Sequence, residues 1–256
     1  MFVHVGKAGG TSARKNFHKT FENSSLKTSY VHCHKPDVEN FDTFIVTIRN
    51  PIDRMISWFH YVHPKNNRFT PHFTEIFDCY EQVNDLATNG LEQTPKELNG
   101  CQKLARNLIS GSAPSHFENV HITRNYKFYT SELLSQSKNK NIYVLRTEHL
   151  SNDWVNTAKD LILKTGTSIE VHEEVQHITH RKGKNPVVTS KDISKKGIQN
   201  ACFFLCSEIQ LYKKLLNRAI NLNANDRSES LEDLAKYCPK EAKSLTCASD
   251  KEITAV

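Results

Sequence analysis

The segment TFIVTI, residues Thr43–Ile48, constrains the fold of this chain more than any other stretch. It is a nearly continuous run of apolar and β-branched residues, which is typical of a parallel strand covered on both faces. Asn50 and Pro51 follow it, a helix-capping residue and a proline at the first helical position. The sequence therefore predicts a buried strand that leads into a helix extending to about His63.

The same alternation of strand and helix recurs along the chain. Phe2–Val5 is a short apolar run that a glycine-rich turn ends, and residues 11–21 carry apolar side chains four positions apart. The other predicted elements are a short strand before Pro36, a strand at Ile142–Leu145, a helix at 154–164 closed by Gly166, and a helix at 194–222. This alternation predicts a three-layer, P-loop-like α/β fold, with a mostly parallel central sheet flanked by helices.

Length and composition favour one sizeable domain. The chain has 256 residues, of which 38% are hydrophobic and 24% charged, as in an ordinary soluble globular protein. We expect a single α/β domain over residues 1–222, with an irregular, partly helical insertion at residues 64–98 that shapes a substrate cleft. Residues 223–256 are expected to form a polar, weakly ordered tail with one short helix. No signal peptide and no transmembrane segment is visible. Because the chain begins inside its first core strand, we expect a missing upstream segment or a gene model that begins late.

The seven cysteines show no CxxC pair, so zinc-ribbon spacing is absent. Two interpretations remain open. The thiols are buried or free, or the protein is lumenal with one or more disulfides, for which Cys79–Cys101 and Cys238–Cys247 are candidate pairs. Because the count is odd, at least one cysteine has no partner within the chain.

The turn GKAGGTS, residues 6–12, joins the first strand to the first helix and suits an anion. A helix N-terminus offers backbone N–H groups and the positive end of a dipole. Gly9 and Gly10 allow close backbone approach, Thr11 and Ser12 add hydroxyl donors, and Lys7 adds a charge. A triphosphate fits poorly, because its usual loop places the lysine after the last glycine. The formal net charge of +6 also favours anionic ligands.

A second motif, RNPIDRMIS, follows the strongest strand. Arg49 lies at the carboxyl end of that strand, where ligands bind in open parallel sheets. Ser57 lies about two turns along the helix, on the side that faces back over the strand end. Arg49 and Ser57 are therefore expected to converge on a second phosphate, with charge-assisted hydrogen bonds from the arginine.

Together the two motifs resemble those of the sulfotransferases that use 3′-phosphoadenosine 5′-phosphosulfate (PAPS). GKAGGTS resembles the 5′-phosphosulfate loop of that family, and RNPIDRMIS, followed by aromatic residues, resembles its 3′-phosphate element. Their order and their separation of about 40 residues also agree. VLRTEHL, residues 144–150, is similar to a later segment of these enzymes. The resemblance covers residues 2–150 and is to the Golgi carbohydrate sulfotransferases rather than the cytosolic ones.

The resemblance implies PAPS as co-substrate, with no metal, since sulfuryl transfer parallels in-line phosphoryl transfer. It places Lys7, Gly9, Gly10, Thr11 and Ser12 at the 5′-phosphosulfate, and Arg49 and Ser57 at the 3′-phosphate. Arg54 matches the motif and is expected mainly to brace the loop. The loop has one more small residue than many members have, which leaves its backbone donors open. Arg181-Lys182-Gly183 resembles a loop that closes over the 3′-phosphate in cytosolic members, although a solvated basic loop or a contact with an acidic glycan is equally compatible.

Two histidines are candidates for the general base. His32 and His34 are two positions apart, so on a strand they lie on the same side. Histidine titrates near neutral pH and accepts a hydroxyl proton readily. A His-x-His pair at this place resembles the uronyl 2-O-sulfotransferases. Either histidine is a candidate, Glu39 is the fallback, and a structural role for both is the alternative; a metal site that includes Cys33 is the least favoured interpretation.

The expected function is transfer of a sulfuryl group from PAPS to a hydroxyl acceptor, expected to be a glycan or other carbohydrate, with Lys7 at the departing phosphate. The resemblance implies a type II Golgi membrane protein whose domain is lumenal. One alternative is a nucleotide-dependent kinase, which needs a lysine beside Ser/Thr and an acidic Mg²⁺ ligand. A second is a non-catalytic binder of nucleic acid or acidic glycan, which leaves the order and spacing of the two motifs unexplained. No nucleic-acid partner is expected.

Overall fold

A computed structural model describes residues 1–64, 75–94, 97–113, 120–136, 139–166, 171, 190–244 and 246–247. Contacts divide the chain into two compact units, each assembled from three segments. The first, which we call the sheet unit, comprises residues 1–49, 126–179 and 211–229. The second, the helical unit, comprises residues 50–125, 180–210 and 230–256.

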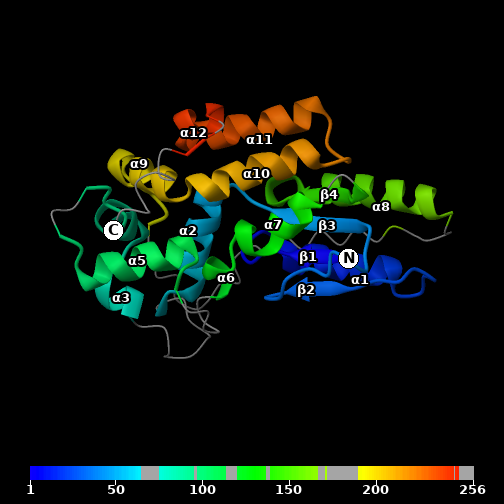
Figure 1. Ribbon diagram of the computed structural model, residues 1–256, viewed down its shortest axis with the longest axis horizontal. Helices are drawn as coiled ribbons and strands as arrows, with labels where there is room; N and C mark the ends of the chain where they lie inside the picture. The colour runs from blue at the N-terminus through cyan, green and yellow to red at the C-terminus, as the bar shows by residue number, and fades with distance from the viewer. Residues whose placement is uncertain are drawn as a thin grey trace. The chain divides into compact units, whose positions relative to one another are not determined.

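The sheet has four strands, all parallel, in the order β2-β1-β3-β4 (Figure 1). The strands are β1 (Phe2–His4), β2 (Tyr30–His32), β3 (Thr43–Ile48) and β4 (Asn141–Arg146). Residues 44–48 of β3 are all buried, on both faces of the strand, as its apolar sequence predicts. The predicted α/β class with a parallel sheet is therefore confirmed.

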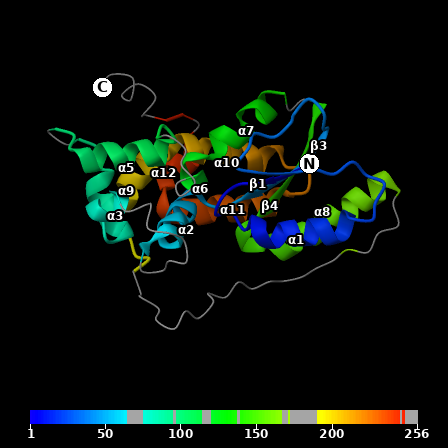
Figure 2. The ribbon, with the colours of Figure 1, turned by 90° about the horizontal axis from the view of Figure 1, so that it is seen from below.

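Helices α1 (Gly10–Phe21) and α8 (Leu150–Thr165) pack on one face of this sheet and lie beside each other in Figure 2. Their apolar side chains form one core cluster with residues of β1, β3 and β4. The buried members of this cluster are Phe2, Ala13, Phe17, Phe21, Ile45, Tyr143, Leu145, Trp154 and Ala158. The outer edge of β4 is also covered, because the Asn221 side chain pairs with the backbone N–H and carbonyl of Val144. This contact protects an edge that would otherwise expose unpaired backbone groups.

The remaining helices complete the two units. In the sheet unit these are α7 (Tyr126–Ser135) and the 3₁₀-helix η4 (Thr147–His149). In the helical unit they are α2 (Pro51–Val62), α3 (Glu75–Cys79), α4 (Val83–Asp85), the π-helix η2 (Leu86–Gly90), α5 (Gly100–Ser110), α6 (Val120–Thr123), α9 (Lys195–Phe204) and α12 (Pro239–Lys243). The division between the units passes through α10 (Cys206–Arg218) and α11 (Ala224–Tyr237).

Several elements differ from their predicted form. The single helix predicted for residues 194–222 is two helices, α9 and α10, which meet at Leu205. The insertion predicted to be irregular and partly helical does contain helices, since α3, α4 and η2 lie among its described residues. The segment expected to be a weakly ordered tail carries α11 and α12, and Leu234 and Cys238 in it are fully buried.

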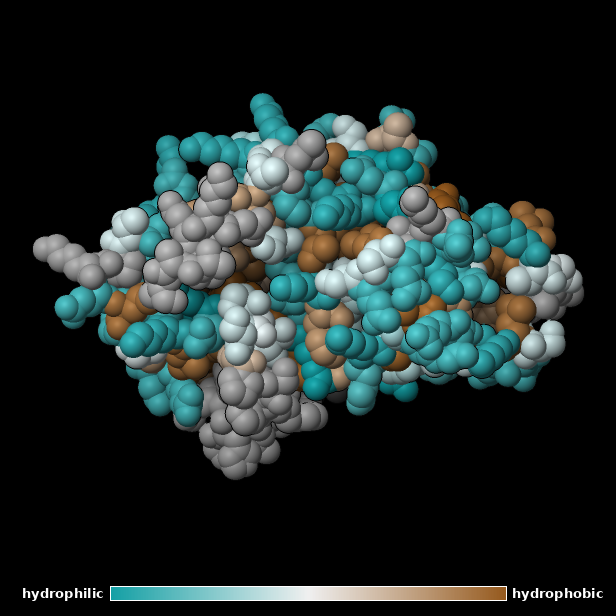
Figure 3. Space-filling model, viewed as in Figure 1, coloured by the Kyte–Doolittle hydropathy of each residue, from teal (hydrophilic) through white to brown (hydrophobic). Residues whose placement is uncertain are grey.

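In the face shown in Figure 3, hydrophilic residues are interspersed with small hydrophobic patches.

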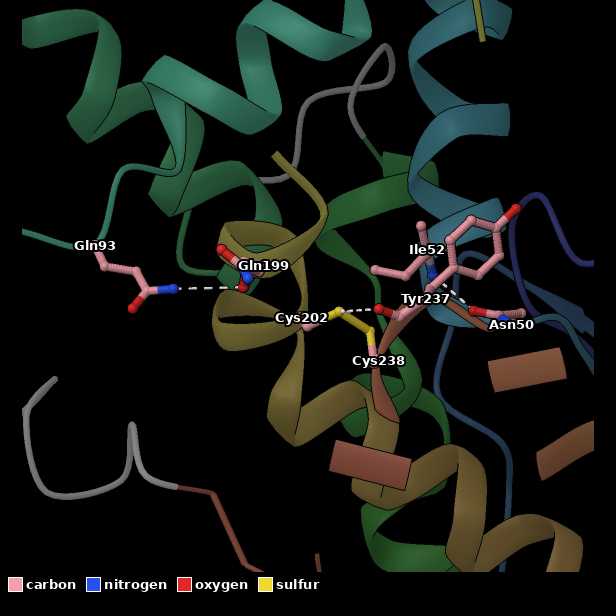
Figure 4. The surroundings of a disulfide bond; sticks show 7 residues. All are labelled: Asn50, Ile52, Gln93, Gln199, Cys202, Tyr237 and Cys238. Atoms are coloured by element: carbon pink, nitrogen blue, oxygen red, sulfur yellow. Dashed lines mark hydrogen bonds between the residues drawn. A yellow bond between two sulfur atoms is a disulfide. The ribbon is translucent and has the colours of Figure 1, made fainter. Parts of the chain in front are cut away.

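Three disulfides lie within the helical unit: Cys79–Cys101, Cys202–Cys238 and Cys206–Cys247. The predicted pair Cys79–Cys101 is confirmed. The predicted pair Cys238–Cys247 is wrong, because Cys202 and Cys206, four positions apart, each bind one of these two cysteines; Figure 4 shows the Cys202–Cys238 bond. The disulfides indicate an oxidising environment. None of the helices in the described parts of the chain is long and apolar enough to cross a membrane.

Candidate functional site

The strand order creates a candidate site in the sheet unit. Strands β2 and β3 flank β1 on opposite sides, so the chain reverses its direction of progress across the sheet between β1 and β3. In open parallel sheets, ligands bind beyond the carboxyl ends of the strands at such a reversal. β1 ends at His4 and continues into the GKAGGTS turn, while β3 ends at Ile48 and continues into Arg49. Both predicted anion-binding motifs therefore begin at this reversal.

The turn after β1 leads into α1, whose N-terminus has no side-chain cap. Gly9 is the N-cap of α1 and adopts a left-handed conformation, with φ of 72°. Its lack of a side chain means that no side-chain oxygen caps the helix, and the first turn contains no acidic residue. The N–H groups of the first turn and the positive end of the helix dipole are thus not balanced by a carboxylate of that turn. This is the arrangement that binds phosphate and sulfate groups.

Lys7 and Arg49, the two cations predicted from the motifs, influence each other at the reversal. The pKa of Lys7 falls from 10.5 to about 8, first because the side chain is buried and second because of the positive charge of Arg49. Two half-buried positive charges that repel each other favour an anionic ligand, since an anion relieves both their repulsion and their loss of hydration. Lys7 and Arg49, predicted independently from separate motifs, are therefore close enough to interact electrostatically.

Arg49 is held at the backbone and has an unsatisfied side-chain donor. The Tyr126 hydroxyl accepts from the Arg49 backbone N–H at 2.8 Å and donates to its carbonyl at 2.6 Å. The Arg49 Nε lies 3.8 Å from Glu148 Oε1, too far for a hydrogen bond. This Nε–H is buried and has no hydrogen-bond partner among the described residues. A buried donor in this state is one that a ligand oxygen would satisfy.

The end of β4 belongs to the same region. Thr147 donates a hydrogen bond from Oγ1 to the carbonyl of Ile48 at 2.8 Å, which ties the end of β4 to the end of β3. A Cβ atom added to Gly9 would lie 3.3 Å from the same Oγ1. The segment VLRTEHL, which resembles a sulfotransferase segment, thus contributes Thr147 and Glu148 to the site. Sequence reasoning singled out neither Thr147 nor Tyr126.

Gly10 also has a packing role, which the sequence did not predict. A Cβ atom at this position would lie 1.9 Å from Cδ2 of His4, which is closer than any real contact. The structure therefore requires a glycine here so that the His4 ring can pack against the start of α1. Thr11 is exposed and Ser12 is buried, so the two hydroxyl residues of the turn differ in accessibility.

The two predicted histidines do not share one strand. β2 ends at His32, and Cys33 adopts a left-handed conformation with φ of 65°, so the alternation of a strand stops before His34. The prediction that both rings lie on one side of a strand is therefore wrong. His32 is half-buried and stacks on His4, with ring centroids 4.1 Å apart. His34 is exposed, with Nδ1 3.1 Å from the His32 carbonyl, and the fallback Glu39 is exposed too.

His4 is the residue near the site that sequence reasoning missed. The residue is 8% exposed, and its Nδ1 lies 2.9 Å from the Tyr30 hydroxyl. A histidine inside an otherwise apolar strand, directly before a glycine turn, is the signal that could have identified it.

The other predicted residues belong to the helical unit or lie outside the described residues. Arg54 is buried, and its guanidinium donates to the carbonyls of His121 and Arg124 at 2.7 and 3.1 Å; that it braces the phosphate-binding loop stays a prediction. Ser57 is half-buried in α2 of the helical unit, and its convergence with Arg49 stays a prediction. Arg181, Lys182 and Gly183 lie outside the described residues.

Comparisons with protein-family models, with curated proteins and with solved structures find no match to this chain. The fold and the strand-end geometry define an α/β protein with a four-stranded parallel sheet and a basic site at its topological reversal.

Proposed function

We propose that this chain is a PAPS-dependent sulfotransferase with a P-loop-like fold, which transfers a sulfuryl group to a hydroxyl of a carbohydrate. One observation carries the proposal: Lys7 and Arg49, each taken from a motif that resembles a PAPS-binding element, interact at the topological reversal of a parallel sheet. The proposed location is the Golgi lumen, which is supported by the resemblance and by three disulfides.

The residues present fit the anionic ends of this co-substrate. The buried Arg49 Nε–H supplies a donor for the 3′-phosphate, and Ser57 is its proposed partner in that role. The backbone of Gly9 and Gly10 and the hydroxyls of Thr11 and Ser12, at the open start of α1, supply donors for the 5′-phosphosulfate. When bound, PAPS supplies an activated sulfuryl group and a phosphate that leaves.

The chemical work of the chain is to balance charge and move one proton. Lys7 stabilises the negative charge that develops on the departing phosphate, as preorganised cations do in related transfers. A histidine of the pair His32 and His34 takes the proton of the acceptor hydroxyl. Removal of water from the half-buried site strengthens both interactions.

Calorimetric titration tests the proposal with 3′-phosphoadenosine 5′-phosphate (PAP), the product form of the co-substrate, and with ATP plus Mg²⁺. The proposal predicts that PAP binds more tightly than ATP. It also predicts that Arg49→Ala weakens PAP binding at least about ten-fold, the usual value of hydrogen bonds to a charged group. Arg218→Ala, which removes an exposed arginine of the same unit, is the matched control and should leave the affinity unchanged. Preference for ATP with Mg²⁺ would support the kinase alternative instead.

A further inference from the structure

The His32 ring is held in a defined orientation by β1. The register of the parallel ladder sets His4 opposite His32, and the two rings stack at 4.1 Å with an interplanar angle of 19°. The His4 ring is itself fixed, by the Tyr30 hydroxyl at 2.9 Å and by the contact with Gly10. Stacked rings at this distance restrict each other's rotation. His4 therefore acts as a rigid platform for His32.

The backbone of His4 also determines which nitrogen of His32 carries the proton. His32 Nδ1 lies 3.2 Å from the His4 carbonyl oxygen, which can only accept a hydrogen bond. Nδ1 must therefore donate, and in the neutral ring this leaves the lone pair on Nε2. A neighbour that fixes the tautomer in this way prepares the other nitrogen for proton transfer.

His34 makes a similar contact of Nδ1 with a backbone carbonyl, but it lies outside the strand. Its Nδ1 contacts the His32 carbonyl at 3.1 Å, but the residue is exposed and lies beyond the end of β2, after the left-handed Cys33. An exposed ring outside the strand retains more rotational freedom than a half-buried ring within a stack. Of the two candidates, His32 is the one that the fold pre-orients.

We infer that His32 is the general base of the proposed transfer and that His4 is its positioning residue; the inference rests on the proposed function. The acceptor hydroxyl gives its proton to His32 Nε2 while its oxygen forms a bond to sulfur. The bridging oxygen of the departing phosphate keeps the electron pair of the sulfur–oxygen bond that breaks. The imidazolium that forms still donates from Nδ1 to the His4 carbonyl, so the ring need not reorient.

Nitrogen NMR of the ¹⁵N-histidine-labelled protein tests, without any ligand, whether the His4 carbonyl fixes the tautomer of His32. His32→Asn assigns the His32 resonances by their disappearance. The expected spectrum of neutral His32 has a protonated Nδ1 and an unprotonated Nε2. A neutral ring protonated at Nε2 would overturn the inference. Because no PAP or acceptor is present, this result is independent of whether the protein is a sulfotransferase.

Substitutions at His4 then test the link to turnover. His4→Ala removes the stacking platform and should lower kcat by about ten-fold or more while leaving PAP affinity and acceptor KM unchanged. His4→Phe retains an aromatic platform and should recover most of the kcat. His18→Ala, an exposed histidine of α1, is the matched control. Equal losses in kcat for His4→Ala and His4→Phe would contradict the platform role. If His4→Ala does not fold, the NMR spectrum of the labelled wild-type protein decides whether the His32 ring is oriented as inferred.

The choice of base is tested by comparing two variants. His32→Asn should reduce kcat by about 100-fold or more, the usual contribution of a general base, and should leave PAP binding intact. His34→Asn should also reduce kcat, but by a factor at least about ten-fold smaller than His32→Asn does. The reverse order would identify His34 as the base. If PAP does not bind to the wild-type protein, the proposed function fails, whereas the tautomer of His32 is still decided by NMR.

Discussion

Both the backbone conformation of Lys7 and the electrostatic environment of its side chain destabilise the folded state. Its φ of 65° is left-handed, which costs a non-glycine residue on the order of 1 kcal/mol or more. Burial and the charge of Arg49 lower its pKa to about 8, so the protonated form is disfavoured in the folded state. Residues with such costs are typical of functional sites, where a ligand offsets them. We infer that the proposed binding of an anion offsets the cost of Lys7 to stability.

We predict that Lys7→Met raises the free energy of unfolding at pH 7 by about 1 kcal/mol, a value reduced for screening by solvent. The folded pKa of about 8 is below the value of 10.5 in the unfolded chain, so the unfolded state binds more protons between these two values. Wild-type stability should therefore rise with pH across this window relative to the variant, and the difference should vanish above it. Urea denaturation of both proteins at pH 7 and pH 10 measures this. A variant less stable than wild type at pH 7 would argue against a costly buried charge.

At the scale of elements, local signals predicted the backbone of the site and non-local packing determined its details. The buried run Thr43–Ile48 matches β3 at both ends, and Pro51 begins α2 as its position after Asn50 indicates. These features depend on neighbouring residues and are legible in sequence. The left-handed conformation of Cys33 and the stack of His4 on His32 depend on partners 26 or more positions away, such as Tyr30 for His4. No local pattern encodes such contacts.

Gly10→Ala tests how tightly β1 packs against α1. Alanine normally stabilises a helix relative to glycine by about 1 kcal/mol. Here we predict a loss of about 1–3 kcal/mol, because the added Cβ meets the His4 ring and the packing must shift. Gly100→Ala is the control, since a Cβ at the start of α5 would meet nothing within 4 Å. Thermal unfolding compares the two, and equal stability of both variants would show that the His4 contact is not tight.

At the scale of the whole molecule, the disulfides divide unevenly between the two units. All three lie in the helical unit and close segments with sequence separations of 22, 36 and 41 residues. Sequence reasoning identified the Cys79–Cys101 pair but not the other two. Cys202 and Cys206 bind Cys238, which lies between α11 and α12, and Cys247, which follows α12, and both were assigned to a loose tail. The C-terminal segment is thus covalently part of the helical unit.

We predict that the double variant Cys202→Ser, Cys238→Ser lowers the free energy of unfolding by about 2–4 kcal/mol, the usual effect of removing a native disulfide. Cys33→Ser is the matched control, because Cys33 takes part in none of the three disulfides. The free energy of unfolding of this variant should differ from that of the wild type by less than about 1 kcal/mol. Guanidinium denaturation without reductant provides the comparison. A double variant as stable as wild type would mean that this bond adds nothing to the folded unit.

We propose that Lys7 binds the departing 5′-phosphate of the co-substrate and that Arg49 binds its 3′-phosphate. The most direct test is calorimetric titration of the protein with PAP at pH 8 in two buffers of different ionisation enthalpy. Because the pKa of Lys7 is about 8 in the unliganded protein, a bound phosphate should raise it, and binding should take up about half a proton per PAP. Lys7→Met should abolish that uptake and weaken binding. Binding of PAP without proton uptake, or with equal uptake by Lys7→Met, would contradict the assignment of this site.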